Sequence, residues 1–207
     1  MKWFNTLVPF LKTVYPKRLW RLPSKKEKVF YLTFDDGPIP EVTPWVLQHL
    51  KKYRAQATFF CLGKNIEKHP GILQQIREGA HQIGNHTFDH LNGWKVNTDE
   101  YLQDVTQFEK LGHSTAYFRP PYGKCTSAQA KAILKKGYKI VMWDIISEDY
   151  NKNLSPEHCL RTVLSQAKNG SIIIFHDSLK AEKNLREILP KVLKHYSNLG
   201  YVFKKLP

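Results

Sequence analysis

The sequence predicts an α/β fold in which about seven strand-and-helix units form a barrel. Three observations lead to this prediction. Apolar runs rich in β-branched and aromatic residues alternate with segments whose apolar residues recur at helical spacing. The runs at 29–35 and 171–176 are typical of fully buried strands. At 207 residues with 42% hydrophobic content, the chain can bury one sizeable core.

The first predicted unit starts at the strand 29–35, which ends at two aspartates and the turn pair Gly37-Pro38. Thr43 is expected to cap the next helix, with Pro44 at its first position. Residues 57–62 are then expected to form the second strand.

Shorter elements are expected up to residue 119. Pro70-Gly71 should divide the helical segment 64–78 into two helices. Asn97 and Glu100 are expected to form a capping box for a helix that ends near Lys110. The remaining strands of this half are expected at 80–84 and 117–119.

The second half repeats the alternation of strands and helices. The expected strands are 138–143, 171–176 and 201–203. The expected helices are 127–136, 155–170 and a final amphipathic helix with Leu185, Ile188, Leu189 and Val192 facing inward.

The net charge of +14 is concentrated at the two ends of the chain. Residues 1–28 carry eight Lys or Arg and one Glu, and residues 179–207 carry seven and two, so the ends supply +12 of the total. A nucleic-acid channel would place basic residues around the reactive groups, so we expect no nucleic-acid partner. We favour a solvated basic rim over attraction to an anionic cell wall or membrane surface. We divide the chain into a basic N-terminal packing arm, 1–28, and one domain, 29–207, which we expect to be monomeric.

Neither the cysteines nor the amino terminus identifies a compartment. Cys61, Cys125 and Cys159 are odd in number and lack a C-x-x-C pair, which predicts reduced core thiols and neither a disulfide framework nor a thiolate zinc site. The apolar stretch 1–11 has no small-residue cleavage site after it and is too short to span a membrane. We interpret it as a packing arm, with an uncleaved surface anchor as the alternative, and leave the localisation open.

Polar and titratable residues follow the predicted strands at their carboxyl ends. These residues are Asp35 and Asp36, His86, Arg119, Trp143 and Asp144, and His176 and Asp177. In a parallel barrel the carboxyl ends converge on one face, which is the usual location of an active site. Adjacent ionised carboxylates at the end of an interior strand need a metal or a cationic partner.

A histidine pair supplies metal-binding side chains. His86 and His90 are four residues apart, so on a helix they would project from one face and could chelate one cation. One carboxylate from the Asp35-Asp36 pair would complete a facial triad. Two imidazoles and one carboxylate suit a divalent ion such as zinc, cobalt or non-haem iron.

With these motifs, the sequence resembles the polysaccharide deacetylases with the NodB homology domain, a carbohydrate esterase family. Thr33-Phe-Asp-Asp-Gly37, Asn85-His-Thr-Phe-Asp-His90 and Phe118-Arg-Pro-Pro-Tyr-Gly123 match its first three motifs, and Ile172-Ile-Ile-Phe-His176 is similar to its fifth. The agreement in order and spacing extends over residues 29–178. The resemblance implies a distorted (β/α) barrel with fewer than eight regular units and metal-dependent removal of N-acetyl, less often O-acetyl, groups from sugars.

The resemblance also implies roles for the residues of the first two motifs. Asp36, His86 and His90 would bind one divalent metal ion, zinc before cobalt or another divalent ion. Asp35 would be the catalytic base, and Arg119 would keep that carboxylate ionised and oriented.

Other residues would complete amide hydrolysis. His176 would protonate the leaving nitrogen. The backbone N–H of Tyr122, fixed by the preceding Pro121, would face the developing oxyanion. Ile174 would form a wall of the acetyl-methyl pocket, and Trp143 is a further candidate for substrate binding.

The fourth motif departs from the family pattern. Many members carry a stretch resembling Trp-x-x-Asp-x-x-Asp-Trp, whereas this chain has Trp143-Asp-Ile-Ile-Ser-Glu-Asp-Tyr150. Ile146 replaces the first expected aspartate and Tyr150 the final tryptophan. We choose Asp149 as the carboxylate that tunes the arginine or the histidine, with Asp144 in reserve.

We therefore expect a hydrolase that removes N-acetyl groups from a glycan or amino sugar, such as peptidoglycan or chitooligosaccharide. An O-acetyl esterase acting on xylan or a deformylase acting on a lipid-linked sugar is the first alternative, because the metal machinery hardly specifies the acyl group. A catalytically dead sugar-binding barrel is the second.

Overall fold

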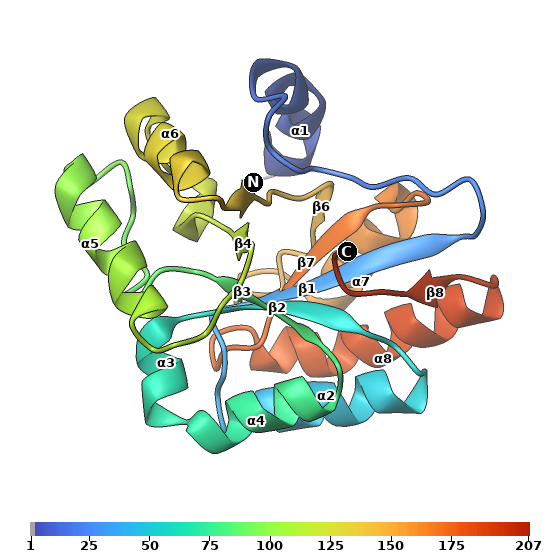
Figure 1. Cartoon of the computed structure of the whole chain (residues 1–207). Coiled ribbons are helices and arrows are strands. Elements are labelled where there is room, and N and C mark those ends of the chain that lie inside the picture. The colour runs from blue at the N-terminus through green and yellow to red at the C-terminus, as the bar shows by residue number, and fades with distance from the viewer. Residues whose placement is uncertain (1–2) are drawn as a thin grey trace.

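One sheet of eight strands organises the part of the chain that the computed structural model describes, residues 3–207. The strands are β1 (Val29–Asp35), β2 (Ala57–Cys61), β3 (Gln82–Asn85), β4 (Tyr117–Phe118), β5 (Lys139–Ile140), β6 (Ile145–Ile146), β7 (Ile172–His176) and β8 (Val202–Phe203). Their order is β5-β4-β3-β2-β1-β7-β6, with β8 paired to the start of β1, and all these pairs are parallel. The sheet curls into a half-barrel (Figure 1), so the predicted distorted α/β barrel is confirmed.

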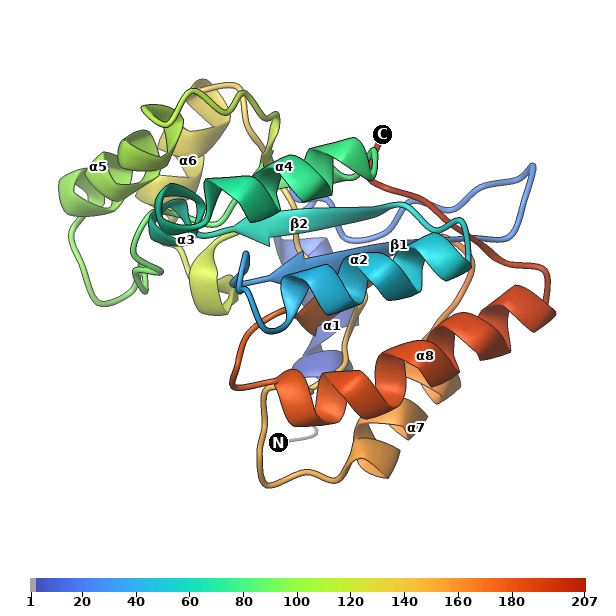
Figure 2. The same ribbon diagram turned by 90° about the horizontal axis from the view of Figure 1, so that it is seen from below.

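Helices surround the sheet. They are α1 (Trp3–Val14), α2 (Thr43–Lys52), α3 (Gly63–Lys68), α4 (Pro70–Glu78), α5 (Thr98–Glu109), α6 (Ser127–Lys135), α7 (Pro156–Gln166) and α8 (Glu182–Asn198). Figure 2 shows α2 between α4 and α8 along one side of the sheet, while α5 and α6 lie together near the short strands. Among residues 3–207, no helix combines the length and the apolar character needed to cross a membrane.

Local signals set several helix starts, with two differences from expectation. The predicted break at Pro70 is confirmed, since α3 ends at Lys68 and α4 begins at Pro70. Asn97 caps α5 by accepting from the Glu100 N–H at 2.9 Å, but the structure shows only this half of the expected box. The complete capping box lies at α6, where the Thr126 hydroxyl accepts from the Gln129 N–H and the Gln129 side chain accepts from the Thr126 N–H.

The cap predicted at Thr43 is wrong. Thr43 is the first residue of α2 and makes no side-chain cap to that helix. Its hydroxyl instead donates to Asp177 at 2.6 Å and accepts from the Ile39 N–H at 2.8 Å. A tertiary partner has therefore replaced the local one.

The N-terminal arm closes the gap in the half-barrel. The strands β5 and β6 end the sheet and do not pair with each other in the described structure. Leu19 exchanges backbone hydrogen bonds with Ile140 (2.8 Å) and Met142 (2.7 Å) on one side, and the Leu22 N–H donates to Gly170 (2.8 Å) on the other. We name this region, where residues 19–22 join β5 to the start of β7, the seam.

The seam accounts for the differences from the predicted strand 138–143. The expected strand 138–143 shortens to β5 because Val141 pairs with Leu19 of the arm. The chain then turns and forms the unexpected β6 against β7. Away from the seam, the strand expected at 80–84 is observed as β3 at 82–85.

Two large apolar clusters fill the molecule. The first lies between the sheet and the helices α2, α4 and α8, and stacks Phe34 against Phe59 and Phe175. The second joins Val8 of α1 to Trp143, with β6 and β7 contributing to the same cluster. All three cysteines are buried and free, as predicted.

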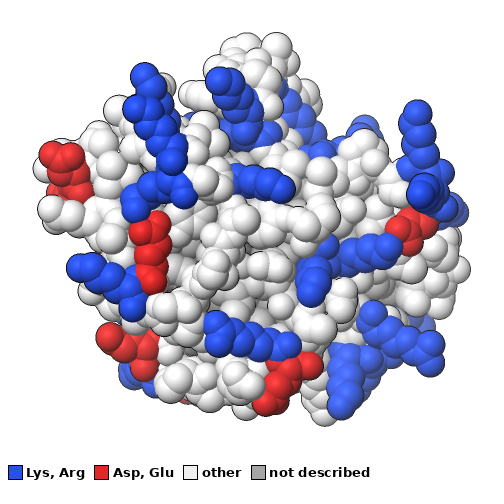
Figure 3. Space-filling model, viewed as in Figure 1, with Lys and Arg blue, Asp and Glu red and all other residues white. Residues whose placement is uncertain are grey.

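Basic side chains are spread over the surface. On the face seen in Figure 3, Lys and Arg occur over many elements and outnumber Asp and Glu. On this face the cations are not gathered on one element.

Candidate functional site

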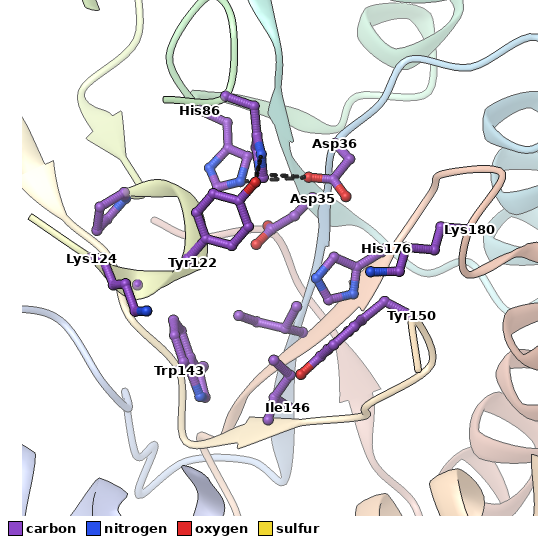
Figure 4. Close-up of a pocket in the computed structure, with 14 residues that line it drawn as sticks. Asp35, Asp36, His86, Tyr122, Lys124, Trp143, Ile146, Tyr150, His176 and Lys180 are labelled. Carbon is purple, nitrogen blue, oxygen red and sulfur yellow. Dashed lines mark hydrogen bonds and ion pairs between the residues drawn. The ribbon is translucent and has the colours of Figure 1, made fainter. Parts of the chain in front are cut away.

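The carboxyl ends of the strands surround a cavity of about 490 Å³ (Figure 4). Its lining residues are Asp35, Asp36, His86, His90, Pro120, Tyr122, Gly123, Lys124, Trp143, Ile146, Tyr150, Ile174, His176 and Lys180. The structure thus brings together most of the side chains predicted for the site. Arg119, Pro121 and Asp149 are buried and do not line the cavity.

Asp35 and Arg119 form a buried ion pair. Nη1 of Arg119 lies 2.6 Å from Oδ1 of Asp35. The guanidinium also donates to the Thr33 hydroxyl at 2.8 Å and to the carbonyls of Val141 (3.3 Å) and Met142 (2.9 Å). Burial lowers the pKa of Arg119, and the Asp35 carboxylate opposes that effect. This network fixes the orientation of Asp35.

Asp36, His86 and His90 form a group that could hold a metal ion. One ligand atom from each lies within 4.8 Å of the others. Oδ1 of Asp36 is 3.2 Å from Nε2 of His90 and 3.7 Å from Nε2 of His86. Nδ1 of His86 donates to the Arg119 carbonyl at 2.8 Å, while Nδ1 of His90 lies 3.1 Å from the Tyr122 hydroxyl. Nε2 of each ring is therefore the nitrogen that faces Asp36.

The protonation states of this group fit a divalent cation. Burial lowers the pKa of His86 to about 4, which keeps the imidazole neutral at physiological pH. Burial alone would raise the pKa of Asp36, but the neighbouring histidines outweigh it and hold that pKa well below its usual range. Oδ1 of Asp36 is buried and makes no hydrogen bond to the described residues. Two imidazoles and an ionised carboxylate whose Oδ1 has no hydrogen-bond partner are the donor set that divalent transition metals take.

The histidine pair lies on a loop and not on a helix, the arrangement for which its spacing was considered. His86 and His90 lie on a loop after β3, in which Thr87 and His90 have φ values of 67° and 66°. These left-handed residues cannot continue a helix. The loop folds back so that both rings face Asp36. On a helix, the spacing of four residues would have placed the two rings on one face.

Hydrogen bonds hold this loop in its strained conformation. Oδ1 of Asn85 accepts from the Thr87 N–H at 2.7 Å. The carboxylate of Asp104, on α5, accepts from the N–H groups of Phe88 (2.8 Å) and Asp89 (3.1 Å). Burial raises the pKa of Asp104, and these hydrogen bonds counteract the rise. No sequence signal distinguished Asp104 from an ordinary helix-surface acid.

His176 and Asp149 form the second pair of the site. Nδ1 of His176 lies 2.8 Å from Oδ1 of Asp149, and the His176 backbone N–H donates to Oδ2 at 2.9 Å. Burial alone would lower the pKa of His176, but the Asp149 carboxylate outweighs it and raises the pKa to about 9. The imidazole is therefore protonated at neutral pH. This contact gives Asp149 the position expected for the fourth-motif carboxylate.

Asp144, the reserve choice, lies elsewhere. Its carboxylate forms ion pairs with Lys12 of α1 and, at 4.0 Å, with Arg21 of the arm. Ser171 donates to the same carboxylate at 2.5 Å. The structure therefore places Asp144 at the seam and away from the arginine and histidine it was expected to tune.

Tyr122 and a group of apolar side chains form the remaining walls. Tyr122 has a φ of 59° and is 55% exposed at the cavity mouth. Pro120 lines the cavity, and the expected Pro121 does not. Trp143 and Ile174 line it as expected. Ile146 and Tyr150, the departures in the fourth motif, contribute to the same lining.

One buried acid at the site received no role from the sequence. Asp177 accepts from the Gly37 N–H at 3.1 Å and from Thr43, which anchors the turn after Asp36. A Cβ at Gly37 would lie 2.0 Å from Oδ2 of Asp177, so only glycine leaves room for this contact. Burial raises the pKa of Asp177 to about 8. Its position next to His176 in the sequence indicated that it lies near the site. Its hydrogen-bond partners could not be predicted, because they are distant in sequence.

Known proteins match both the sequence and the fold. A family model described as polysaccharide deacetylase matches residues 23–141. A peptidoglycan-N-acetylglucosamine deacetylase of Bacillus cereus is 36% identical over 191 residues, covering 89% of this chain and 69% of that protein. A chitooligosaccharide deacetylase of Azorhizobium caulinodans is 34% identical over 160 residues, covering 74% of this chain and 76% of that protein.

A solved structure extends the match to nearly the whole chain. The Bc1960 peptidoglycan N-acetylglucosamine deacetylase, crystallised in complex with an N-oxidanyl-benzamide compound, aligns with a TM-score of 0.87 at 33% identity. The alignment covers 96% of this chain and 95% of that one. The half-barrel and its helices are therefore shared with an enzyme of known structure.

Proposed function

Because this chain belongs to the polysaccharide deacetylase family, we propose that it is a metal-dependent hydrolase that removes the N-acetyl group from an amino sugar of a glycan. The observation that carries the proposal is the juxtaposition of three groups in one cavity: the Asp36-His86-His90 cluster, the Asp35–Arg119 pair and the His176–Asp149 pair. Amide hydrolysis needs an activated water, stabilisation of an oxyanion and a proton for the leaving amine. These groups can supply all three.

Asp35 acts as the general base in this proposal. A divalent ion held by Asp36, His86 and His90, zinc first and cobalt as an alternative, would polarise the acetyl carbonyl and acidify water to a pKa of ~7. Asp35 takes the proton of the attacking water. Arg119 holds this carboxylate in place through the 2.6 Å ion pair, so the base is oriented for the water.

His176 acts as the general acid. Its Nδ1 is engaged by Asp149, so Nε2 is the nitrogen that delivers a proton to the leaving amine. The backbone N–H of Tyr122 faces the developing oxyanion. Ile174, with Trp143, forms the apolar wall against the acetyl methyl group.

Acyl release from a panel of substrates tests the proposal. The full chain, stripped with a chelator and reloaded with zinc or cobalt, is incubated with chitooligosaccharides, peptidoglycan fragments, acetyl-xylan and an N-formylated lipid-linked sugar. We expect acetate from the N-acetylated glycans only when metal is restored. The double variant His86→Ala/His90→Ala should bind no metal and release no acetate.

Other outcomes would replace the proposal. Acetate from acetyl-xylan alone would indicate an O-acetyl esterase, and formate alone would indicate a deformylase. Glycan binding without release of either acid, in a chain with about one metal ion bound, would indicate a sugar-binding barrel.

A further inference from the structure

Two lysines line the cavity without a part in the proposed chemistry. Lys124 follows the turn Pro121–Gly123, and Lys180 lies in the loop after β7, so they approach from opposite sides (Figure 4). Within residues 3–207, neither amine forms an ion pair with a carboxylate. Their positive charges are therefore not neutralised by the described protein.

An aromatic ring lies beneath each of these amines. The amine of Lys124 is 4.9 Å from the ring centre of Trp94, and the amine of Lys180 is 5.4 Å from that of Tyr150. Cation–π contacts of this kind hold a lysine in place while leaving its N–H groups available to a ligand. The cavity thus has a lysine and an aromatic ring on each of two sides.

Trp94 is exposed, yet the backbone beneath it is fixed. Its side chain is 65% exposed. The fully buried Gln129 donates to the carbonyl of the preceding Gly93 at 2.9 Å. A Cβ on Gly93 would lie 2.8 Å from the Lys124 carbonyl oxygen, so the two loops are in close contact. A large apolar ring held at the surface beside a glycan-sized cavity is suited to pack against a sugar ring.

The carboxylates inside the cavity do not compensate the two lysines. Asp35 is paired with Arg119, and Asp36 faces the two histidines. A substrate that fills the cavity therefore meets acids at the reaction centre and cations at the rim. The rim favours a ligand whose negative charges lie outside the reacting sugar.

We propose that Lys124, Lys180 and Trp94 form a substrate subsite that selects glycans carrying carboxylates next to the N-acetylated sugar. Peptidoglycan strands have this chemistry, because a lactyl group without a peptide has a free carboxylate and an attached peptide brings its own carboxylates, whereas chitooligosaccharides are neutral. This inference rests on the proposed function and specifies its substrate class. Lys124 and Lys180 contact the anionic substituents, and Trp94 packs against a neighbouring sugar ring.

A charge-matched substrate pair tests the two lysines. The metal-loaded full chain is assayed with a soluble peptidoglycan oligomer, with the same oligomer after amidation of its carboxylates, and with a chitooligosaccharide of equal ring number. We expect a higher kcat/KM on the anionic oligomer than on its amidated form. Lys124→Met or Lys180→Met should each reduce this preference about twofold to fivefold, the size of an exposed ion pair.

Controls separate the rim from the overall charge. Lys131→Met removes an exposed lysine of α6 that does not line the cavity, and it should leave the preference unchanged. Rates on all three substrates should change little in Lys131→Met, whereas in the two rim variants the rate on the anionic oligomer should fall more than the rates on the two uncharged substrates. Raising the ionic strength should weaken the preference of the unmodified chain, because salt screens charges at an exposed rim.

A second variant series tests the aromatic surface. Trp94→Ala should raise KM about threefold to tenfold on both charged and neutral oligomers, while kcat and metal content stay constant. Trp94→Phe should restore most of the loss, because it keeps an aromatic face. A KM unchanged by Trp94→Ala would remove this residue from the subsite.

The outcomes also distinguish the two proposals. Acetate release from no substrate would contradict the proposed function. Equal kcat/KM on the anionic and amidated oligomers, with both releasing acetate, would leave the function intact and overturn the subsite. A loss of preference in Lys131→Met as large as in the rim variants would overturn the subsite as well.

Discussion

Asp35 and Asp36 are sequence neighbours whose carboxylates have different partners. Successive side chains of a strand point in opposite directions, and Asp36 also leaves the strand with a φ of 81°. Asp35 therefore meets the guanidinium of Arg119, while Asp36 meets the rings of His86 and His90. One dipeptide can in this way supply both a base and a metal ligand.

The two aspartates should give different phenotypes when substituted. Asp36→Ala is expected to empty the metal site, because it removes the carboxylate of the cluster. Asp35→Asn is expected to retain the metal and to reduce kcat by roughly 10²- to 10⁴-fold, the typical contribution of a positioned general base. Metal analysis of the purified variants together with acetate release checks both statements. Loss of metal in Asp35→Asn with retention in Asp36→Ala would reverse the roles.

The pair of His176 and Asp149 should set the alkaline limit of activity. A general acid must be protonated, and the pKa of His176 is raised to about 9, against ~6.5 in an unfolded chain. The acid form of His176 is therefore present at neutral pH, its ion pair stabilises the fold fully below pH ~6.5, and both are lost as pH rises through about 9. A cation bound at Asp36 would offset part of the rise in the pKa of His176. The alkaline fall in activity of the metal-loaded enzyme should therefore lie at or below pH 9.

Asp149→Asn should move this alkaline limb to lower pH. The substitution removes the charge that supports protonation, so burial then lowers the pKa of His176. A pH profile of kcat measures the shift, and NMR titration of the histidines assigns it to His176. Asp144→Asn serves as the control, because its carboxylate faces Lys12 and Arg21. A limb that moved equally in both variants would contradict the role of Asp149.

At the scale of elements, the loop 86–90 depends on α5. Asp104 satisfies two loop N–H groups, and Thr87 and His90 hold left-handed conformations that cost free energy. Asp104→Ala should therefore weaken metal binding by about 10- to 100-fold, as loss of an outer hydrogen-bonding partner does at other metal sites. Calorimetric titration with zinc measures the effect. Asp104→Asn keeps one acceptor oxygen, so its zinc affinity should lie between those of the unmodified chain and Asp104→Ala. An unchanged zinc affinity in Asp104→Ala would show that the loop keeps its conformation without Asp104.

The sequence predicted the ends of the strands better than the loops that follow them. The carboxyl ends of β1 and β7 carry Asp35 and His176 to one cavity, and Arg119 after β4 reaches Asp35 from behind it, because parallel strands share a direction. The H-x-x-x-H spacing indicated a histidine pair but does not reveal the positive φ values of the loop that carries it. The contacts of Asp104 and Asp177 link distant segments, which local patterns do not encode.

For the whole molecule, metal binding should appear as thermal stability. A ligand that binds only the folded chain at a hundredfold excess over its Kd adds ~2.7 kcal/mol, which corresponds to roughly 5–10 °C in the Tm of a domain of this size. Chelation should lower the Tm by that amount, and zinc should restore it. The shift should vanish in His86→Ala, measured by calorimetry in the same buffers. A Tm indifferent to metal in the unmodified chain would argue against a resident ion.

The closure of the barrel also belongs to the whole molecule. Seven alternating units were expected to suffice, but β5 and β6 do not pair with each other in the described chain, and the arm residues 19–22 complete the ring of hydrogen bonds. The arm has in sequence a basic, partly apolar character with no strand pattern. Its pairing partners lie at the two edges of the sheet, far from the arm in sequence, so a local pattern does not predict them.

The apolar wall of the cavity has a consequence for how this enzyme could acquire new acyl specificities. Trp143 and Ile146 line the proposed acetyl pocket, and their side chains belong to the apolar cluster that includes Val8 of α1, while the backbone of Ile146 pairs with β7. Substitutions there can enlarge the pocket without breaking a sheet ladder. Ile146→Val should increase the rate on N-propionyl relative to N-acetyl substrates. Ile145→Val, which faces the other apolar cluster, should lose similar stability, ~0.5–1.5 kcal/mol, without that change. Acyl preference in this chain would then evolve at this apolar wall without a change in the catalytic groups; an unchanged ratio in Ile146→Val would locate it elsewhere.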